Sequence, residues 1–276
     1  MRSFTLLALA ASLALAPAAF AGDEDDKHEN YFKTDDNLDL GEIVLEANNV
    51  NAQDDVLVFK TKVKNVSTDW IFIKKHEIEF EVGGQSLKPY DGKEKPSLVI
   101  EPEKDKSLNL KLKGSGLHVD EFSVQLKGVY KAASAGTPMK TGDFVLPPAN
   151  NNIEYGPFKC SVTSHDQATQ VTKTTWECQY TGDGIGYIDA SRIGVQIESG
   201  DQFASTFRKN KPAMLMHNDK TKFTTTFEIE KRIVDMQFAT LQLQWGETFS
   251  ESKLEAVDSD SWDFAIDEAL TTEKNQ

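Results

Sequence analysis

The sequence predicts an all-β protein made of two tandem antiparallel β-sandwich domains that arise from an internal duplication. Three observations predict this fold. Apolar and polar residues alternate with a period of two in many short segments. Turn-forming residues such as Gly83-Gly84 and Asp91-Gly92 recur between those segments. One half of the chain also aligns with the other when the sequence is shifted by 115 residues. This shift places Leu45 on Cys160 and Val63 on Cys178.

The alternation is clearest in three segments of the first half. Residues 76–84 read HEIEFEVGG, with isoleucine, phenylalanine and valine on one face and glutamates on the other. Residues 107–114 alternate leucine with polar residues, and 56–65 alternate apolar residues with lysine. Such segments are typical of antiparallel strands with one face buried in the core and the other exposed to solvent. About seven short strands in a unit of about 110 residues favour a two-sheet sandwich.

The repeat sets the predicted domain boundaries. The aligned apolar positions place one unit at 38–147 and the second at 153–266. Between them, residues 148–152 read PANNN, a turn-prone composition that suits a short linker. Near the end of each unit, DFVL at 143–146 resembles DFAI at 263–266, which makes 262–266 the last strand of the second unit.

With this strand pattern and unit length, the chain resembles the tandem immunoglobulin-like domains of exported bacterial proteins. The resemblance covers both units and implies β-sandwiches that act as interaction or structural domains. It rests on pattern alone, so it carries over no functional residue.

The ends of the chain have different compositions. Residues 1–21 have a basic start, an apolar stretch and an Ala-Phe-Ala cleavage site, which predicts a cleaved secretory signal peptide.

Residues 22–37 are acidic and are expected to form a disordered lead-in, and residues 267–276 are expected to form a mobile acidic tail. Within 262–270, Trp262, Ile266 and Leu270 also have helical spacing, so a short helix is the alternative to the last strand.

The two cysteines predict one structural disulfide. An exported protein with two cysteines favours a bridge, and Cys160 and Cys178 occupy the inward positions of Leu45 and Val63 in the other unit. A hairpin centred near residue 169 would place the two side chains opposite each other. No C-x-x-C spacing supports a redox-active pair.

No motif indicates a catalytic site or a cofactor. Met214, Met216 and His217 are weak candidates for a soft metal such as copper, but the two methionines align with Leu98 and Ile100, which favours a role in the core. The five histidines are scattered, and no His-x-His or His-Glu-x-x-His motif supports zinc. No nucleophile or phosphate-loop motif occurs in a usable context, and we expect no enzyme activity.

Charge and export limit the class of partner. The net charge of -14 argues against nucleic acid. No apolar run after the signal peptide is long enough to span a bilayer. We therefore expect a periplasmic or extracellular, non-catalytic interaction or structural module of the cell envelope, with a protein or glycan partner. The alternatives are a protein that binds carbohydrate or a divalent cation and, less favoured, an unrecognised hydrolase.

Overall fold

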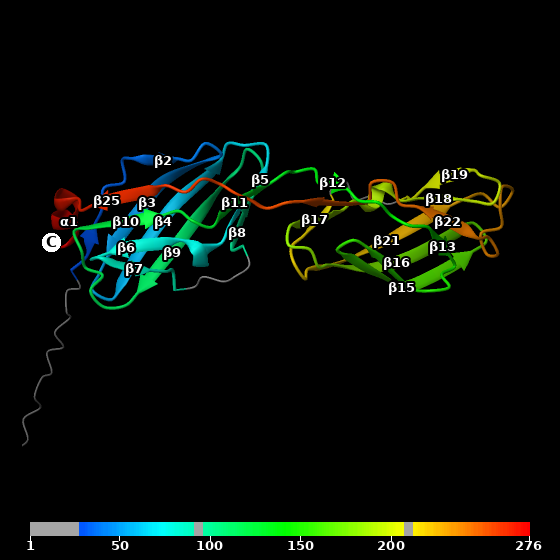
Figure 1. The fold of residues 1–276 in the computed structure, drawn as a ribbon, viewed down its shortest axis with the longest axis horizontal. Coiled ribbons are helices and arrows are strands. Elements are labelled where there is room, and N and C mark those ends of the chain that lie inside the picture. Colours follow the sequence, from blue (N-terminus) through cyan, green and yellow to red (C-terminus); the bar gives the residue numbers. More distant parts are fainter. Residues whose placement is uncertain (1–27, 91–95, 207–211) are drawn as a thin grey trace, which may run out of the picture.

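The computed structural model describes residues 28–90, 96–206 and 212–276, and the predicted signal peptide 1–21 lies outside them. The described residues form two β-sandwich domains that follow one another along the long axis of the molecule (Figure 1). All strand pairings between named elements are antiparallel, which agrees with the predicted all-β class. The helical elements of the described part are α1 (Glu268–Lys274) and the single 3-10 turns η1 (Lys75–Glu77) and η2 (Ala190–Arg192).

Domain 1 packs one long sheet against a layer of two short sheets. The long sheet has the order β1-β3-β4-β9, with β2 paired to β3. The opposite layer has the orders β25-β10-β6-β7 and β24-β11-β5-β8. The strands are β1 (Asn30–Tyr31), β2 (Asn37–Asp39), β3 (Ile43–Ala52), β4 (Val56–Asn65), β5 (Trp70–Ile73), β6 (Glu79–Val82), β7 (Gln85–Leu87), β8 (Leu98–Ile100), β9 (Asp105–Lys113), β10 (Glu121–Gln125), β11 (Val129–Ala132), β24 (Glu255–Ala256) and β25 (Ser261–Ala265).

The second layer is divided because its strands bend in the middle. Between β10 and β11 the chain turns at Gly128, whose φ is +78°. A Cβ atom at that position would lie 2.7 Å from the carbonyl oxygen of Lys74, so only glycine fits. The Lys74 N–H donates to the Gly128 carbonyl at 2.9 Å, just before η1 separates β5 from β6. Two strand pairs of this layer, β5 with β6 and β10 with β11, are thereby separated at this place.

Domain 2 repeats this arrangement with the orders β14-β15-β16-β21, β13-β22-β18-β19 and β12-β23-β17-β20. The offset of 115 holds at the start of β15 against β3, β16 against β4 and β21 against β9, and both hairpins carry a bulge at the equivalent place. A shared element order alone does not show common origin, so the duplication stays a prediction. The strands are β12 (Thr137–Pro138), β13 (Phe144–Leu146), β14 (Asn152–Tyr155), β15 (Phe158–Ala168), β16 (Val171–Tyr180), β17 (Ile185–Ile188), β18 (Gly194–Gln196), β19 (Gln202–Ala204), β20 (Ala213–Leu215), β21 (Lys220–Glu228), β22 (Leu241–Gln244) and β23 (Phe249–Ser252).

The final strands of the two repeats are exchanged between the domains. From the first repeat, β12 pairs with β23 and β13 pairs with β22 of domain 2. From the second repeat, β24 pairs with β11 and β25 pairs with β10 of domain 1. Domain 1 therefore consists of β1–β11 with β24, β25 and α1, and domain 2 of β12–β23.

This exchange differs from the predicted boundaries. The predicted units 38–147 and 153–266 each assign their last strand to the wrong domain. The predicted linker 148–152 lies inside domain 2, between β13 and β14. The physical reason is that each exchanged strand places its apolar face in the other domain's core: Phe144 and Leu146 in the core of domain 2, Trp262 and Phe264 in the core of domain 1.

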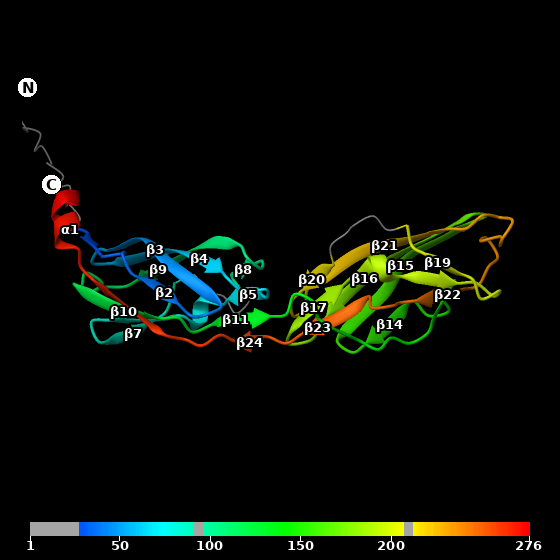
Figure 2. The same cartoon turned by 90° about the horizontal axis from the view of Figure 1, so that it is seen from above.

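The two domains meet in a small apolar junction. It buries Phe72 and Ala132 of domain 1 against Ile185 and Tyr187 of domain 2. The Tyr187 hydroxyl donates to the Ala133 carbonyl at 3.0 Å, and the Ser252 hydroxyl donates to the same oxygen at 2.9 Å. The chain crosses this junction twice, after β11 and after β23 (Figure 2). Because two crossings and a shared cluster join the domains, they are held more firmly than by a single linker.

The structure also corrects the predicted ends. The part of the lead-in that is described, 28–37, is ordered: β1 pairs with β3, and Phe32 is buried in the core of domain 1. Residues 22–27 lie outside the described part. The tail forms α1, whose N-cap Asp267 accepts from the Leu270 N–H at 3.0 Å. The segment 262–270 thus contains both a strand and the start of a helix.

The predicted disulfide is present. Cys160 and Cys178 are directly opposite each other in the β15–β16 hairpin, with an S–S distance of 2.03 Å. Their positions match the Leu45–Val63 pair of domain 1, as the repeat predicts. Within 28–90, 96–206 and 212–276, the structure contains no helix long and apolar enough to cross a membrane.

Candidate functional site

The strongest candidate site is the loop 229–240 that joins β21 to β22, here called the tip loop. It lies at the end of domain 2 farthest from α1 (Figures 1 and 2). The equivalent connection of domain 1, between β9 and β10, spans only 114–120. The second repeat therefore has a longer segment at this position, and its sequence IEKRIVDMQFAT includes several apolar residues.

The tip loop exposes apolar side chains that a core would normally bury. Phe238 is 81% exposed and Ile233 is 45% exposed. Beside them, the loop forms an open groove with the β18–β19 turn. Its lining residues are Ile197, Glu198, Ser199, Ile233, Val234, Asp235, Phe238, Ala239 and Thr240. Exposed apolar groups gathered at one place on a surface are typical of interaction sites.

The tip loop is fixed to the body of the domain. Met236 is fully buried, and its N–H donates to the Thr169 carbonyl at 3.0 Å. The Ile229 N–H donates to the Gln170 carbonyl at 3.0 Å. Residues 169–170 form the turn of the disulfide-bonded hairpin, so this loop is attached to the covalently bridged part of the domain. Phe238 is consequently presented outward from an anchored segment.

The core beneath the tip loop is polar, unlike its counterpart in domain 1. Thr172, Thr174 and Thr225 are fully buried where domain 1 has Leu57, Phe59 and Leu110. His165 Nδ1 lies 2.9 Å from the Thr174 hydroxyl, and the Gln167 side chain donates to the Ala239 carbonyl at 3.2 Å. Burial lowers the pKa of the His165 imidazole. The Thr172 hydroxyl and His165 Nε2 are buried without a hydrogen-bond partner, so this end of the domain buries less apolar surface and leaves polar groups unsatisfied.

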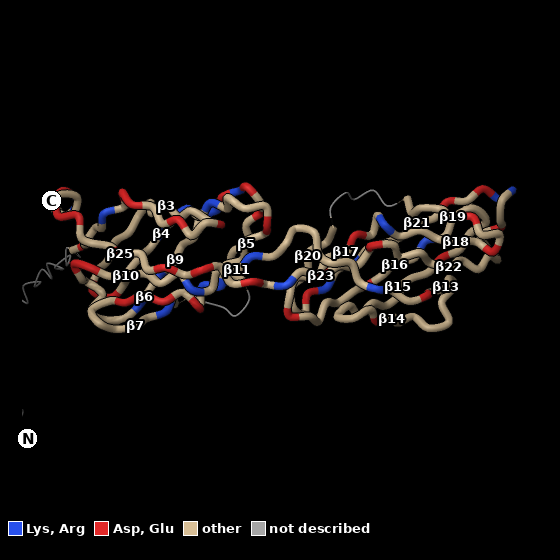
Figure 3. The backbone as a smooth tube through the Cα atoms, turned by 45° about the horizontal axis from the view of Figure 1, so that its top comes forward, with Lys and Arg blue, Asp and Glu red and all other residues tan. Residues whose placement is uncertain are grey.

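The tip loop itself carries two acidic and two basic residues, and these pair with each other. Lys231 pairs with Asp235 at 3.8 Å, and Arg232 pairs with Glu230. Figure 3 shows both acidic and basic positions at this end of domain 2. The groove beside the loop is lined by Glu198 and Asp235 and by no lysine or arginine.

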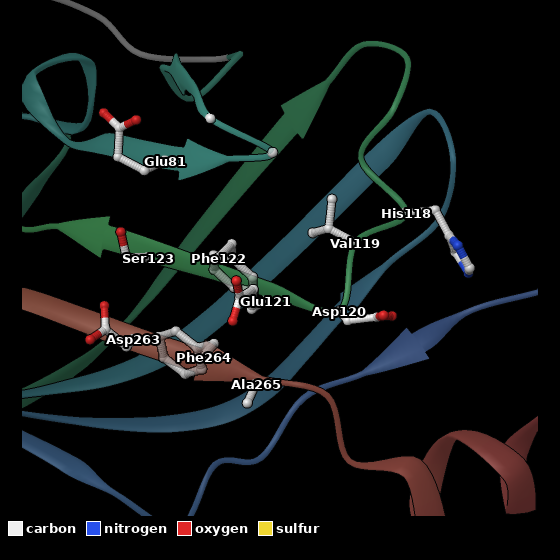
Figure 4. Close-up of a pocket in the computed structure, with 12 residues that line it drawn as sticks. Glu81, His118, Val119, Asp120, Glu121, Phe122, Ser123, Asp263, Phe264 and Ala265 are labelled. Carbon is white, nitrogen blue, oxygen red and sulfur yellow. The ribbon is translucent and has the colours of Figure 1, made fainter.

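A broad open cleft lies on the outer face of domain 1, over β6, β10 and β25 (Figure 4). Ser123 is directly opposite Glu81 on one side and Asp263 on the other, so the two carboxylates are separated by two strand spacings, about 9–10 Å. That separation is too large for two carboxyl groups to share a proton. On the opposite face of the same strands, the aromatic rings of Phe122 and Phe264 are buried in the core of domain 1.

Two histidines that are far apart in sequence meet beside this cleft, and one of them, His118, also lines it. His28 Nδ1 and His118 Nε2 are 3.0 Å apart, and both side chains are exposed. They line a small surface depression together with Gln53, Asp54 and Asp55. Sequence reasoning missed this pair because 90 residues separate the histidines and because His28 falls within the predicted disordered lead-in.

The predicted copper candidates Met214, Met216 and His217 lie at the junction between the domains. Met214 and Met216 pack against the apolar junction cluster, which agrees with a role in the core. His217 instead has its Nδ1 3.1 Å from the Gly182 carbonyl oxygen. Among the described residues, no group of three or more His, Cys, Asp or Glu side chains has an arrangement that could hold a metal ion.

Comparisons with known proteins give no family. No family model matches the chain, and no curated protein matches it. Among solved structures, it is similar to the C-terminal globular domain of an oligosaccharyltransferase from Pyrococcus abyssi, at 10% identity and a TM-score of 0.18. The alignment covers 81% of this chain and 47% of that one, so this chain spans about half of the length of the structure that it matches. A similarity this low carries no argument about function.

Proposed function

We propose that the protein is an exported, non-catalytic interaction module that binds a protein partner through the tip loop of domain 2. The observation that carries the proposal is the 81% exposure of Phe238 on an anchored loop. An aromatic ring held outward in this way is the kind of residue that contributes most to protein interfaces. The disulfide, which is typical of exported proteins, supports the export part of the proposal.

The tip loop favours a protein partner over a lipid surface. Anionic membranes attract basic segments, whereas the groove beside this loop is lined by Glu198 and Asp235 and by no lysine or arginine. The complementary surface is therefore an apolar pocket, into which Phe238 and Ile233 insert, with a rim of lysine and arginine. Domain 1 has no such feature at its equivalent loop, where Leu117 is buried. This difference favours domain 2 as the domain that binds the partner.

The doubly crossed junction supports a role for domain 1. Because both crossings and the cluster around Tyr187 hold the domains together, domain 1 acts as a spacer that carries the tip loop at a set distance from α1. A rigid spacer lowers the entropy lost on binding compared with a flexible tether.

The test is site-specific photo-crosslinking with residues 22–276 in the native envelope. A photoreactive residue at position 238 is expected to capture one reproducible protein, and the same residue at position 90 is expected not to. Tyr90 is the matched control because it is an exposed aromatic residue, 69% exposed, in domain 1. The captured protein is then purified and titrated against Phe238→Ser and Tyr90→Ser variants.

We expect Phe238→Ser to weaken binding by about 2 kcal/mol, roughly 30-fold, as for a central aromatic contact, and Tyr90→Ser to leave it unchanged. Binding should also weaken as salt screens the acidic rim. Equal capture from positions 238 and 90, or equal affinity of the two variants, would contradict the proposal.

A further inference from the structure

The histidine pair at the free end of domain 1 has the geometry of a metal site. The two nitrogens are 3.0 Å apart, close enough for both to bind one ion once the proton between them is lost. Among the divalent first-row ions, Cu(II) is the one that imidazole binds most strongly.

The backbone holds both histidines in place. The loop that carries His118 is fixed to the β3–β4 turn, because the Leu117 N–H donates to the Asp54 carbonyl at 3.0 Å. Two residues after His28, the Asn30 side chain donates to the Val119 carbonyl at 2.9 Å. Each histidine is thus at most two residues from a backbone position that is hydrogen-bonded to a neighbouring segment of domain 1. A pair fixed in this way needs little rearrangement to bind an ion.

The surroundings favour a cation. Asp54 and Asp55 line the same depression as the two imidazoles and lower the cost of bringing a divalent charge to this surface. With no third His, Cys, Asp or Glu ligand at metal-binding distance in the described part of the chain, water completes the coordination. The depression is open to solvent, so water has access.

We propose that His28 and His118 form a surface site for Cu(II), with two imidazole nitrogens as the protein ligands. The ion would join the N-terminal segment 28–32 to the 114–120 loop. Asn275 connects the same segment to α1, since its side chain donates to the Glu29 carbonyl at 2.8 Å. Copper therefore stabilises the end of domain 1 where both termini of the described chain meet.

The experiment is a Cu(II) titration of residues 22–276, stripped with chelator, followed by electron paramagnetic resonance and thermal unfolding. The variants are His28→Ala, His118→Ala and, as matched control, His217→Ala, another exposed histidine, whose Nδ1 lies 3.1 Å from the Gly182 carbonyl oxygen. All three residues are at the surface, so the variants are expected to fold. Retention of the disulfide and of the circular dichroism spectrum checks this.

We expect the wild type and His217→Ala to bind about one Cu(II) with two nitrogen ligands and to gain thermal stability. Each pair variant should lose affinity by at least the roughly 10- to 100-fold seen when weaker, outer-shell partners are removed. Binding should also weaken in acid, because a metal ion binds only the deprotonated ring nitrogen of imidazole. If copper does not bind, the contact is only an imidazole hydrogen bond. If His28→Ala binds copper as the wild type does, the ion is held elsewhere, and either result overturns the proposal.

Discussion

Phe122 of the first repeat stacks on Phe264 of the second, with ring centroids 5.1 Å apart and ring planes 13° from parallel. The two residues are directly opposite each other on β10 and β25. Domain 2 also has an aromatic contact between the two repeats. The ring centroids of Phe144, from the first repeat, and Trp176, from the second, are 5.2 Å apart. Neither core is complete without a strand from the other repeat, so each domain needs residues from both halves of the sequence.

Because β25 completes the core of domain 1, removing its buried ring Phe264 should destabilise that domain. Phe264→Ala should destabilise domain 1 by about 3–5 kcal/mol, because a buried ring is lost and a cavity remains. Amide hydrogen exchange, which resolves the two domains, should show the loss in β6 and β10 first. Val145→Ala is the control, since Val145 is on the equivalent exchanged strand but 42% exposed. Equal effects of the two substitutions would mean that β25 does not complete the core.

The disulfide should stabilise domain 2 alone. Replacing Cys160 with Leu and Cys178 with Val reproduces the Leu45–Val63 pair of domain 1 and keeps the positions apolar. In the loop-entropy model, the closed loop, with a sequence separation of 18, contributes about 3 kcal/mol. Denaturant unfolding, followed by exchange in each domain, should show this loss in domain 2. A loss shared equally by both domains would indicate that the two unfold as one unit.

The sequence carried enough information for the strands and the disulfide but not for the exchange. Strands β13 and β25 have the same apolar alternation, so either would fit beside β10 or β22, and no local pattern selects between them. The choice depends on where the chain crosses the junction, a three-dimensional property.

The candidate sites differ in how far the sequence indicates them. The tip loop can be detected in the sequence, because the offset between the two repeats grows between β21 and β22 and the inserted residues include Phe238. No sequence pattern indicates the contact of His28 with His118, because only the fold brings together residues 90 positions apart.

Two buried threonines beneath the tip loop should respond in opposite ways to the same substitution. Thr172→Val removes a buried hydroxyl that has no partner, so we expect stability to increase by about 1 kcal/mol. Thr174→Val removes the hydroxyl that contacts His165 Nδ1 and leaves a second buried ring nitrogen unsatisfied. That change should cost about 1–3 kcal/mol. Denaturant midpoints of the two variants provide the comparison, and a shift in the same direction for both would rule out this account.

Buried tyrosine hydroxyls should make the protein sensitive to alkali. Burial raises the pKa of Tyr187 to about 12, and a hydrogen bond to Glu77 raises that of Tyr130 to about 12. Both folded-state values lie above the unfolded value of about 10. The folded protein therefore binds these protons more tightly, and the stability that they contribute is present in full below about pH 10. It is lost as pH rises from about 10 to 12, because the unfolded chain ionises first.

Tyr187→Phe isolates the contribution of the junction to this effect. The substitution removes the hydroxyl that donates to the Ala133 carbonyl at 3.0 Å, and with it the ionisable group between the domains. We expect a cost of about 1 kcal/mol at pH 8 and a smaller fall in stability between pH 9 and 11 than in the wild type. Tyr90→Phe, at an exposed position, should change neither quantity. Unfolding free energies measured across this pH range, together with tyrosinate absorbance, provide the check. An unchanged pH dependence in Tyr187→Phe would mean that the junction tyrosine does not control alkaline unfolding.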